Sequence, residues 1–219
     1  MMGKGTLRIM TDIVLLQPTT GDVLDLILDD HRRFEELLRL CRRNDTDRPA
    51  ARQALAELLV AHAVSEEEKV YPQLRRSRAI SGHLEEHGQE EHAEIIEALL
   101  AFLQAKGTDT QKYDDTLEDL TTAVNHHTNE EEQTILNPAR EDVSPAQRAE
   151  LAVAWTTRRN ELIKQGCASE TQVATLLKEA EAKAVVAPEH AREEAEAIEE
   201  EAKAKAHDVK EAAKANAAG

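Results

Sequence analysis

Two stretches of the chain repeat the same arrangement of metal-binding side chains. His62 is followed four residues later by Glu66, and Glu131 follows His127 at the same spacing. Residues four apart lie roughly 40° apart around an α-helix, so each histidine shares a helix face with its glutamate. A neutral imidazole and a carboxylate one turn apart can bind one metal ion or contribute to a pair of adjacent ions. The repeat therefore predicts two helices that face each other across a metal site.

Two further histidines are expected at the same depth. His31 and His92 lie within stretches that place apolar residues at helical spacing. Because a helix rises about 1.5 Å per residue, positions counted from the connecting turns can be compared between helices. On this count His31 lies level with His62, and His92 lies level with His127. We expect one layer formed by His31, His62, His92 and His127, with Glu66 and Glu131 a turn away.

The sequence leaves two ligands of this layer undecided. His87 lies five residues before His92, which is about 140° around an ideal helix, so the two do not share a face. A local π-bulge would bring them together; otherwise only one of them is a ligand. His126 points roughly 100° away from His127, and either histidine could reach a layer with Glu131. We favour His127 because it reproduces, to within one residue, the spacing from histidine to proline in the earlier stretch.

The main alternative to a metal site is a set of ordinary buried histidines. A single histidine on an apolar face is usually a hydrogen-bonded core or boundary residue. Here four histidines fall at one depth, and leaving them and two glutamates unpaired would cost on the order of 1–3 kcal/mol each. A metal offsets this cost for all six residues together. Other side chains nearby are expected in different environments: a solvated face for Glu67, Glu68, Glu130 and Glu132, and packing for Tyr71.

The elements that must hold these residues are helices. Aromatic residues make up only 2% of the chain, so the core must be built from aliphatic residues, which favours helices. Four amphipathic stretches joined by short polar turns predict an all-α, up-down-up-down four-helix bundle. Ser144-Pro145 and Gly166 are typical of the start and end of an additional helix. We expect four segments: an irregular N-terminus at 1–18, the bundle at 19–143, a docking helix at 144–167 and a charged tail at 168–219.

The tail changes the character of the chain. From Ala168 onward the sequence is rich in Ala, Glu and Lys and has few large aliphatic residues. Such a segment has high helix propensity but little apolar surface to bury. We expect an exposed helix or a disordered tail, which serves solubility or contact with a protein partner.

Composition excludes several classes of protein. A formal net charge of −16 excludes nucleic acid as a direct partner, because binding phosphates needs a basic face. No apolar run is long enough to cross a bilayer, and the N-terminus does not resemble a signal peptide. Cys41 and Cys167 are far apart and form neither a disulfide framework nor a metal motif. We expect a soluble, cytoplasmic protein without a membrane partner.

In combination, the motifs resemble the hemerythrin-like family, also called HHE cation-binding domains. The resemblance covers about residues 22–140 and is carried by Asp30-His31-Arg32-Arg33-Phe34, His62-x3-Glu66 through Tyr71-Pro72, His87-Gly88-Gln89-Glu90-Glu91-His92, and His127-x3-Glu131. It implies a four-helix bundle that holds two non-haem iron ions joined by an oxo or hydroxo bridge. A ligand set of imidazole and carboxylate without thiolate also suits iron, and manganese as the less favoured alternative, better than structural zinc.

The resemblance also implies a role for each ligand. Glu66 and Glu131 would bridge the two irons. His31 and His62 would bind one iron, whereas the other would be bound by His92 and His127, together with His87 if the helix allows it. The sequence departs from the O2-carrying members, whose third helix has His-x3-His and whose second bridge is Asp at i+5. These departures argue against reversible O2 carriage, and metal binding is still expected.

The expected function is binding or sensing of a small ligand at this centre: O2, nitric oxide or peroxide. No catalytic residue is assigned, since a metal- or oxygen-binding protein is favoured over a dedicated enzyme. The alternatives are a di-iron oxidoreductase that consumes peroxide or nitric oxide, and an iron-homeostasis protein whose acidic surface attracts cations. A metal-free helical interaction module is the least favoured alternative, and metal analysis would separate it from the others.

Overall fold

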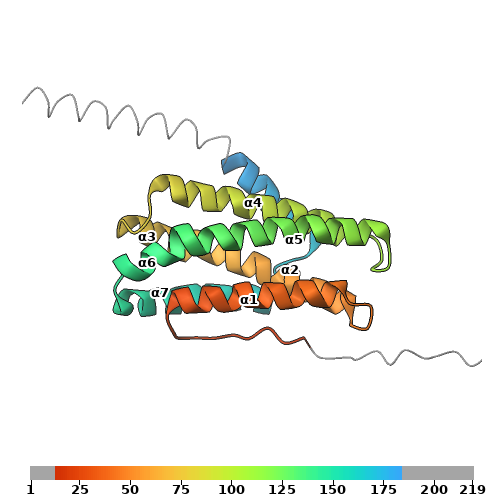
Figure 1. Ribbon diagram of the computed structural model, residues 1–219, viewed down its shortest axis with the longest axis horizontal. Helices are drawn as coiled ribbons and strands as arrows, with labels where there is room; N and C mark the ends of the chain where they lie inside the picture. The colour runs from red at the N-terminus through yellow and green to blue at the C-terminus, as the bar shows by residue number, and fades with distance from the viewer. Residues whose placement is uncertain (1–12, 184–219) are drawn as a thin grey trace, which may run out of the picture. The chain divides into compact units, whose positions relative to one another are not determined.

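The computed structural model describes residues 13–183, and every regular element in this part of the chain is a helix (Figure 1). The all-α fold predicted from the sequence is confirmed. Residues 13–22 are irregular, and residues 1–12, which make up most of the expected N-terminal segment 1–18, lie outside the described part. In chain order the elements are α1 (Val23–Arg42), α2 (Arg48–Ser65), η1 (Glu66–Val70), α3 (Tyr71–Arg76), α4 (Gly82–Gln104), α5 (Gln111–Glu131), η2 (Glu132–Leu136), α6 (Asn137–Asp142) and α7 (Pro145–Gln165).

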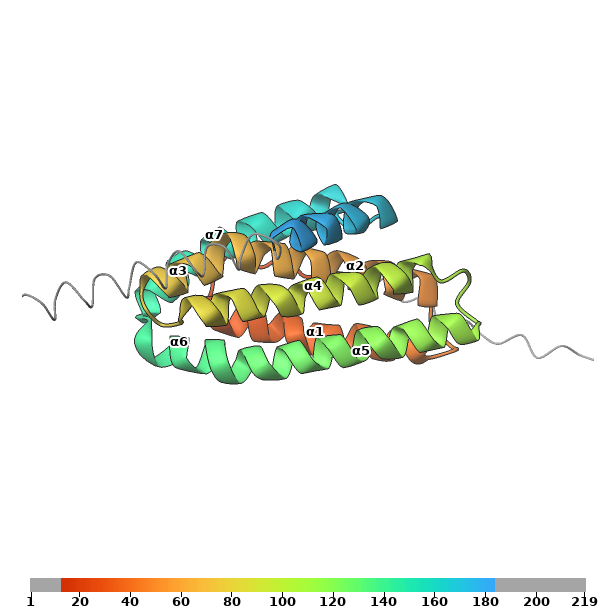
Figure 2. The ribbon, with the colours of Figure 1, turned by 90° about the horizontal axis from the view of Figure 1, so that it is seen from above.

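The bundle is formed by α1, α2, α4 and α5. Helices α1 and α2 pack as one antiparallel pair, α4 and α5 as another, and the pairs meet through α1 with α5 and α2 with α4. Helix α7 packs on α2 and α1, and Figure 2 shows it on the side of α2 that faces away from α5. The additional helix expected after the bundle therefore covers the α1–α2 pair.

The helix ends follow the residue types in the sequence. The Asp22 side chain accepts a hydrogen bond from the Leu24 amide and caps α1. A capping box between Ser144 and Gln147 begins α7. Gly166 ends that helix with φ of 69°, a left-handed conformation that glycine adopts without the steric cost of a side chain. These local signals set where each helix starts and stops.

Two π-helical turns, η1 and η2, interrupt the helices that carry the His-x3-Glu pairs. Helices α2, η1 and α3 follow one another without a gap, as do α5, η2 and α6. The Tyr71 amide donates to the Glu66 carbonyl and the Asn137 amide to the Glu132 carbonyl, which are bonds over five residues. A π turn places residues five apart above one another and is common at functional sites. The structure therefore places π turns on these two helices, and not in α4 where the spacing of His87 and His92 would have required one.

The hydrophobic core is divided into two clusters by the histidine layer. In α1, Ile27 belongs to one cluster and Phe34 to the other, with His31 between them. In α5 and η2, Val124 and Ile135 likewise belong to different clusters on either side of His127. Packed apolar side chains above and below the layer exclude water and hold the polar groups in fixed positions.

Packing continues beyond the end of α7 and into the segment assigned to the tail. Cys167, Ala168 and Val173 are buried in the first core cluster, and Leu176 and Leu177 pack against it from a helix that begins at Glu170. The expected boundary at residue 168 therefore lies too early, because these few apolar residues share one helix face. Residues up to Lys178 belong to the same compact unit as the bundle, and the expected tail from residue 184 on lies outside the described residues.

We expect Val173→Ala to lower the free energy of unfolding by about 1–3 kcal/mol, because it removes two buried methyl groups and leaves a cavity. The matched control is Val153→Ala on α7, since Val153 is 49% exposed whereas Val173 is fully buried. Chemical denaturation of both variants measures the difference. Equal, small effects would show that the helix starting at Glu170 does not dock in solution.

Two further properties of the described residues are the apolarity of the helices and the state of the cysteines. Within residues 13–183, none of the helices combines the length and apolarity needed to span a membrane. Cys41 and Cys167 are both free thiols and both are buried. Burial raises the pKa of each thiol to about 11, so neither is a reactive thiolate near neutral pH.

Candidate metal centre

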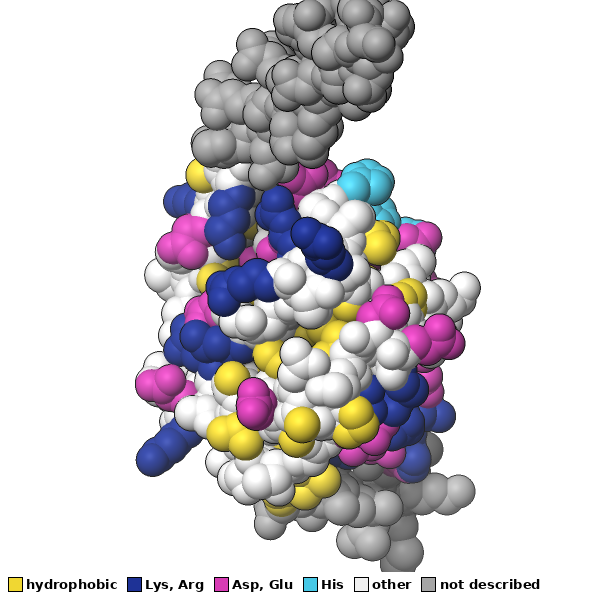
Figure 3. Space-filling model, turned by 90° about the vertical axis from the view of Figure 1, so that its left-hand side faces the viewer, with side chains coloured by type: hydrophobic (Ala, Val, Ile, Leu, Met, Phe, Trp, Pro, Cys, Tyr) yellow, Lys and Arg dark blue, Asp and Glu magenta, His cyan; other side chains and the backbone are white. Residues whose placement is uncertain are grey.

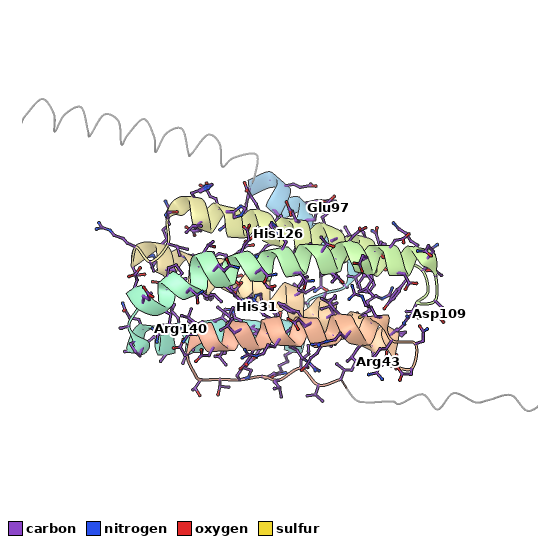
Figure 4. All side chains as sticks on the ribbon, in the orientation of Figure 1. His31, Arg43, Glu97, Asp109, His126 and Arg140 are labelled. Carbon is purple, nitrogen blue, oxygen red and sulfur yellow. The ribbon has the colours of Figure 1, made fainter. Side chains whose placement is uncertain are left out.

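The histidine layer predicted from the sequence is present at the middle of the bundle. Six polar side chains meet there, each at most 4% exposed: His31, His62, Glu66, His92, His127 and Glu131. They come from all four bundle helices and from the first residue of η1. In Figure 4, His31 lies between α1 and α5, whereas His126 lies on the side of α5 next to α4. Antiparallel packing therefore brings together side chains that are as far as 100 residues apart in the chain.

The Nε2 atoms of the four histidines surround the two carboxylates. Glu66 Oε2 lies 3.2 Å from His62 Nε2 and 3.4 Å from His92 Nε2. Glu131 Oε2 lies 3.2 Å from His31 Nε2 and 3.7 Å from His127 Nε2. Each carboxylate thus contacts two histidines from two different helices. This is the arrangement expected of carboxylates that bridge two positions.

The ligand atoms fall into two overlapping groups, and within each group they lie within 4.8 Å of one another. One group consists of His31, His62, His127 and Glu131. The other consists of His62, Glu66, His92 and His127. Four oxygen and nitrogen ligands at such separations suit a metal ion, and two such groups side by side suit two adjacent ions, with each shared imidazole bound to one of them.

Several of these atoms are buried and make no hydrogen bond, even where a histidine nitrogen faces a carboxylate oxygen at 3.2 Å. They are His31 Nε2, His62 Nε2, Glu66 Oε1 and Glu131 Oε2. A buried polar atom that makes no hydrogen bond costs about 1–3 kcal/mol, and native proteins contain few of them. A cation among these atoms would accept their lone pairs and remove that cost. The donor set of this structure therefore fits a metal ion.

Each of the four histidines also has a carboxylate at its other ring nitrogen. The Nδ1 contacts are His31 with Glu132 at 2.9 Å, His127 with Glu91 at 3.1 Å, His92 with Glu67 at 3.3 Å and His62 with Asp30 at 3.4 Å. A carboxylate at Nδ1 fixes the ring orientation, raises the basicity of the imidazole and leaves Nε2 for a metal. Glu67 and Glu132, which were expected on a solvated face, therefore also contact layer histidines, and the Glu132 side chain is at the same time 42% exposed.

A regular sequence signal accompanies these outer carboxylates. Asp30 and Glu91 directly precede a layer histidine, whereas Glu67 and Glu132 directly follow a layer glutamate. Each of them contacts a histidine on a neighbouring helix, because adjacent residues point about 100° apart. The sequence analysis did not identify these four carboxylates, although their positions next to the inner histidines and glutamates were a usable signal.

Asp30 is in turn held by an arginine from outside the bundle. Arg159 on α7 donates from Nε to Asp30 Oδ2 at 2.6 Å and from Nη2 to Asp30 Oδ1 at 2.7 Å. Both side chains are buried. Arg159 also stacks on Trp155, whose ring lies 5.9 Å from that of His62. Helix α7, expected only to dock, thus reaches His62 through Asp30.

Tyr71 contacts the centre directly, in addition to the packing expected from the sequence. Its hydroxyl donates to Glu131 Oε1 at 2.8 Å and lies 3.5 Å from Glu66 Oε2. The π turn η1 places it above Glu66, five residues earlier. Gly88 on α4 provides the space, since a Cβ there would lie 3.2 Å from the Tyr71 hydroxyl oxygen.

The electrostatics of the layer favour cations. Burial lowers the pKa of His62 and His92, but the nearby carboxylates outweigh it and raise the pKa to about 9 for His62 and about 10 for His92. Burial would raise the pKa of Glu66, yet His62 and His92 hold it well below its usual range. His127 has a lowered pKa because it is buried and lies beside His92. Protons and metal ions therefore compete for the same ring nitrogens, and metal binding would release protons.

His87 and His126, whose roles the sequence left undecided, differ from the buried layer. Helix α4 is regular from Gly82 to Gln104, so His87 and His92 lie on different faces. The side chain of His87 is 39% exposed and that of His126 is 56% exposed. The structure brings His127 into the layer with Glu131 and leaves His87 and His126 outside it. The roles of the layer residues as ligands stay predictions.

Comparison with known protein families agrees with this geometry. The family described as hemerythrin HHE cation binding domain matches residues 22–139, which is more than half of the chain. No curated protein and no solved structure matches. The matched residues include the four bundle helices and all six side chains of the layer. The chain belongs to the hemerythrin HHE cation-binding domain family.

Proposed function

We propose that the buried layer holds two non-haem iron ions, joined by an oxo or hydroxo bridge, and that the protein binds or senses O2, nitric oxide or peroxide there. The observation that carries the proposal is the pair of overlapping ligand groups, each with three imidazoles and one carboxylate. Imidazole and carboxylate without thiolate suit iron, with manganese as the less favoured alternative. Bound ferrous ions would supply the electrons and an open coordination position for such a ligand.

The residues of the chain support binding of a small ligand in a dry environment. The layer is closed above and below by apolar clusters, which exclude water and bulky molecules. The four carboxylates at Nδ1 hold the imidazoles in fixed orientations, so the layer needs little rearrangement to bind cations. A small uncharged ligand is the kind of molecule that such a site admits.

We expect protein purified from iron-replete cells to contain about two irons per chain, because the layer offers two overlapping ligand groups. Its optical spectrum should show a near-ultraviolet charge-transfer band, and titration with nitric oxide should change that spectrum. Metal analysis and absorption spectroscopy make the measurement. Protein that carries only trace metal after iron-replete expression would refute the proposal.

A second candidate function, an oxidoreductase that consumes peroxide, is supported by Tyr71. Burial and the charges of Glu131 and Glu66 raise the pKa of its hydroxyl well above the usual value, so it stays protonated near neutral pH. The hydroxyl is held at Glu131 by a 2.8 Å hydrogen bond. From this position the hydroxyl could donate a hydrogen bond or its proton to a reacting oxygen. The position supports this role and the raised pKa does not, because a raised pKa makes the phenol a weaker acid.

Tyr71→Phe tests this second function. We expect the variant to keep its metal, since the hydroxyl lies at the carboxylates and not at a histidine nitrogen. Sustained peroxide consumption by the wild-type protein should fall by about 100-fold or more, the usual contribution of a general acid. The reaction tested is disproportionation of two peroxide molecules to two water molecules and one O2, which needs no outside reductant, and an oxygen electrode follows the O2 released. If the wild-type protein consumes no more than one equivalent of peroxide, the enzyme function is excluded and the binding function is retained.

A further inference from the structure

A second cluster of metal-binding side chains lies on the outer side of the α4–α5 pair. The ligand atoms of His87, Glu91 and Glu130 lie within 4.8 Å of one another. His87 Nε2 is 2.9 Å from Glu130 Oε2 and 3.9 Å from Glu91 Oε1. His126 reaches the same oxygen of Glu91, at 3.6 Å from its Nε2. Figure 3 shows histidine side chains at the surface next to acidic ones.

The outer cluster repeats the pattern of the inner layer. His87 and Glu91 are four residues apart on α4, and His126 and Glu130 are four residues apart on α5. On α5 the doubled His126-His127 and Glu130-Glu131 thus form two His-x3-Glu pairs that are rotated by about 100° from each other. One pair faces the bundle interior, and the other faces the outer edge of α4. The outer pair is therefore arranged like a ligand set, and its residues are not a scattered group of surface charges.

Glu91 supplies an independent indication of a ligand. Its side chain is only 6% exposed, and its Oε1 atom is buried without a hydrogen-bond partner. That atom is the one that faces both His87 and His126. A buried carboxylate oxygen left in this state costs free energy that a cation would recover. The other members of the cluster are partly exposed, so the position is open to ions from solvent.

We propose that His87, Glu91, His126 and Glu130 form a separate binding site for a single first-row divalent transition-metal ion. Two imidazoles and two carboxylates suit Zn²⁺, Fe²⁺ or Mn²⁺, and general affinity favours Zn²⁺ among these. The site is distinct from the buried layer, because none of its four residues belongs to either inner group. In this proposal His87 and His126 are ligands of the outer site and not of the inner centre.

Glu91 connects the outer site to the inner centre. Its Oε2 atom lies 3.1 Å from Nδ1 of His127, while Oε1 faces the outer site. A cation on Oε1 would withdraw charge from the carboxylate that orients His127 and makes it basic. Occupation of the outer site is therefore linked to the metal affinity of the layer through one shared side chain.

The experiment is equilibrium dialysis of the full-length protein, as purified with its iron, against Zn²⁺, followed by analysis of zinc and iron per chain. We expect the wild type to bind a zinc equivalent that is lost or weakened at least about tenfold in His87→Ala and in Glu130→Gln, because each removes one ligand. Iron content should stay the same in both variants. Circular dichroism checks that these partly exposed substitutions leave the helices intact.

The matched controls are His83→Ala and Glu97→Gln. His83 lies one turn before His87 on α4, and Glu97 is an exposed carboxylate on the same helix, labelled in Figure 4. Both controls should bind zinc like the wild type. Glu66→Gln, which changes the inner layer, should lower iron and keep the outer zinc equivalent. Two results would overturn the proposal. In the first, His87→Ala and Glu130→Gln bind as much zinc as the wild type. In the second, the controls lose as much zinc as these two variants.

Discussion

Glu66→Gln is expected to remove at least one metal ion per chain and to abolish the near-ultraviolet spectrum of an iron pair. Glu66 Oε2 contacts His62 and His92 from two different helices, and its Oε1 atom is buried without a partner. The amide keeps the shape of the side chain but removes its charge. Two cations a few ångströms apart repel each other strongly in a low-dielectric interior, so one bridging charge matters greatly.

Glu131→Gln should have the same effect for the same reason. Its carboxylate contacts His31 and His127 and accepts the hydrogen bond of Tyr71. His127→Ala should also lose metal, whereas His126→Ala should keep the inner ions because His126 lies outside the layer. Metal analysis of purified variants, with spectra, gives the comparison.

The matched control for these variants is Glu68→Gln. Glu68 belongs to the same run of glutamates as Glu66, but it pairs with Arg158 at the surface. This variant should keep its full metal content. If both Glu66→Gln and Glu131→Gln retain two metal ions per chain, the His-x3-Glu pairs do not form the centre. Loss of metal in Glu68→Gln would point to general destabilisation instead.

Arg159→Met is expected to lower the free energy of unfolding by about 3–5 kcal/mol, the usual cost of leaving a buried charge without its partner. Arg159 is the bidentate partner of Asp30, and both side chains are almost fully buried. It also donates to the Leu16 carbonyl at 3.0 Å, so the substitution frees a second acceptor. Thermal or chemical denaturation measures the loss.

The metal centre should respond to the same substitution. Asp30 contacts Nδ1 of His62, and loss of such an outer partner typically lowers metal affinity about 10- to 100-fold. Competition with a chelator measures this affinity in protein that remains folded. Addition of Asp30→Asn to the Arg159→Met variant should restore part of the stability, because it removes the unpaired charge, and should leave the metal affinity low.

The neighbouring residue gives the control. Arg158 pairs with Glu68 at the surface, where such ion pairs contribute about 0–1 kcal/mol. Arg158→Met should therefore change stability little and metal affinity not at all. If Arg159→Met lowers the free energy of unfolding no more than Arg158→Met does, the contact between α7 and Asp30 does not form in solution.

Helix α7 begins after the residues that match the family, so the contact from Arg159 to Asp30 is a feature of this chain outside the shared domain.

Local patterns in the sequence were enough to predict the bundle and the inner layer. Residues four apart on one helix share a face whatever surrounds the helix, so the two His-x3-Glu pairs could be recognised directly. Short polar turns make successive helices antiparallel, which placed His31 and His92 at the depth of those pairs. Asp22, Ser144 and Gly166 similarly mark helix ends through contacts within a few residues.

Contacts between helices could not be predicted in the same way. The partner of a ring nitrogen depends on how each helix is rotated about its axis, which is decided by packing of the whole core. Glu67 and Glu132 therefore read as a solvated face, yet they contact His92 and His31. Arg159 reaches Asp30 across 129 residues of chain, a distance at which no periodic pattern carries information.

The sequence by itself determined which side chains can share a helix face and which lie at one depth, and with them the helical bundle and the six residues of the layer. Only the tertiary structure decided that the π turns begin at Glu66 and directly after Glu131, and that His87 lies outside the layer. A π turn adds a residue to a helix turn, and neighbouring helices must supply the packing that holds it. Rotation and packing of helices are properties of the assembled bundle, and for that reason no local pattern could reveal them.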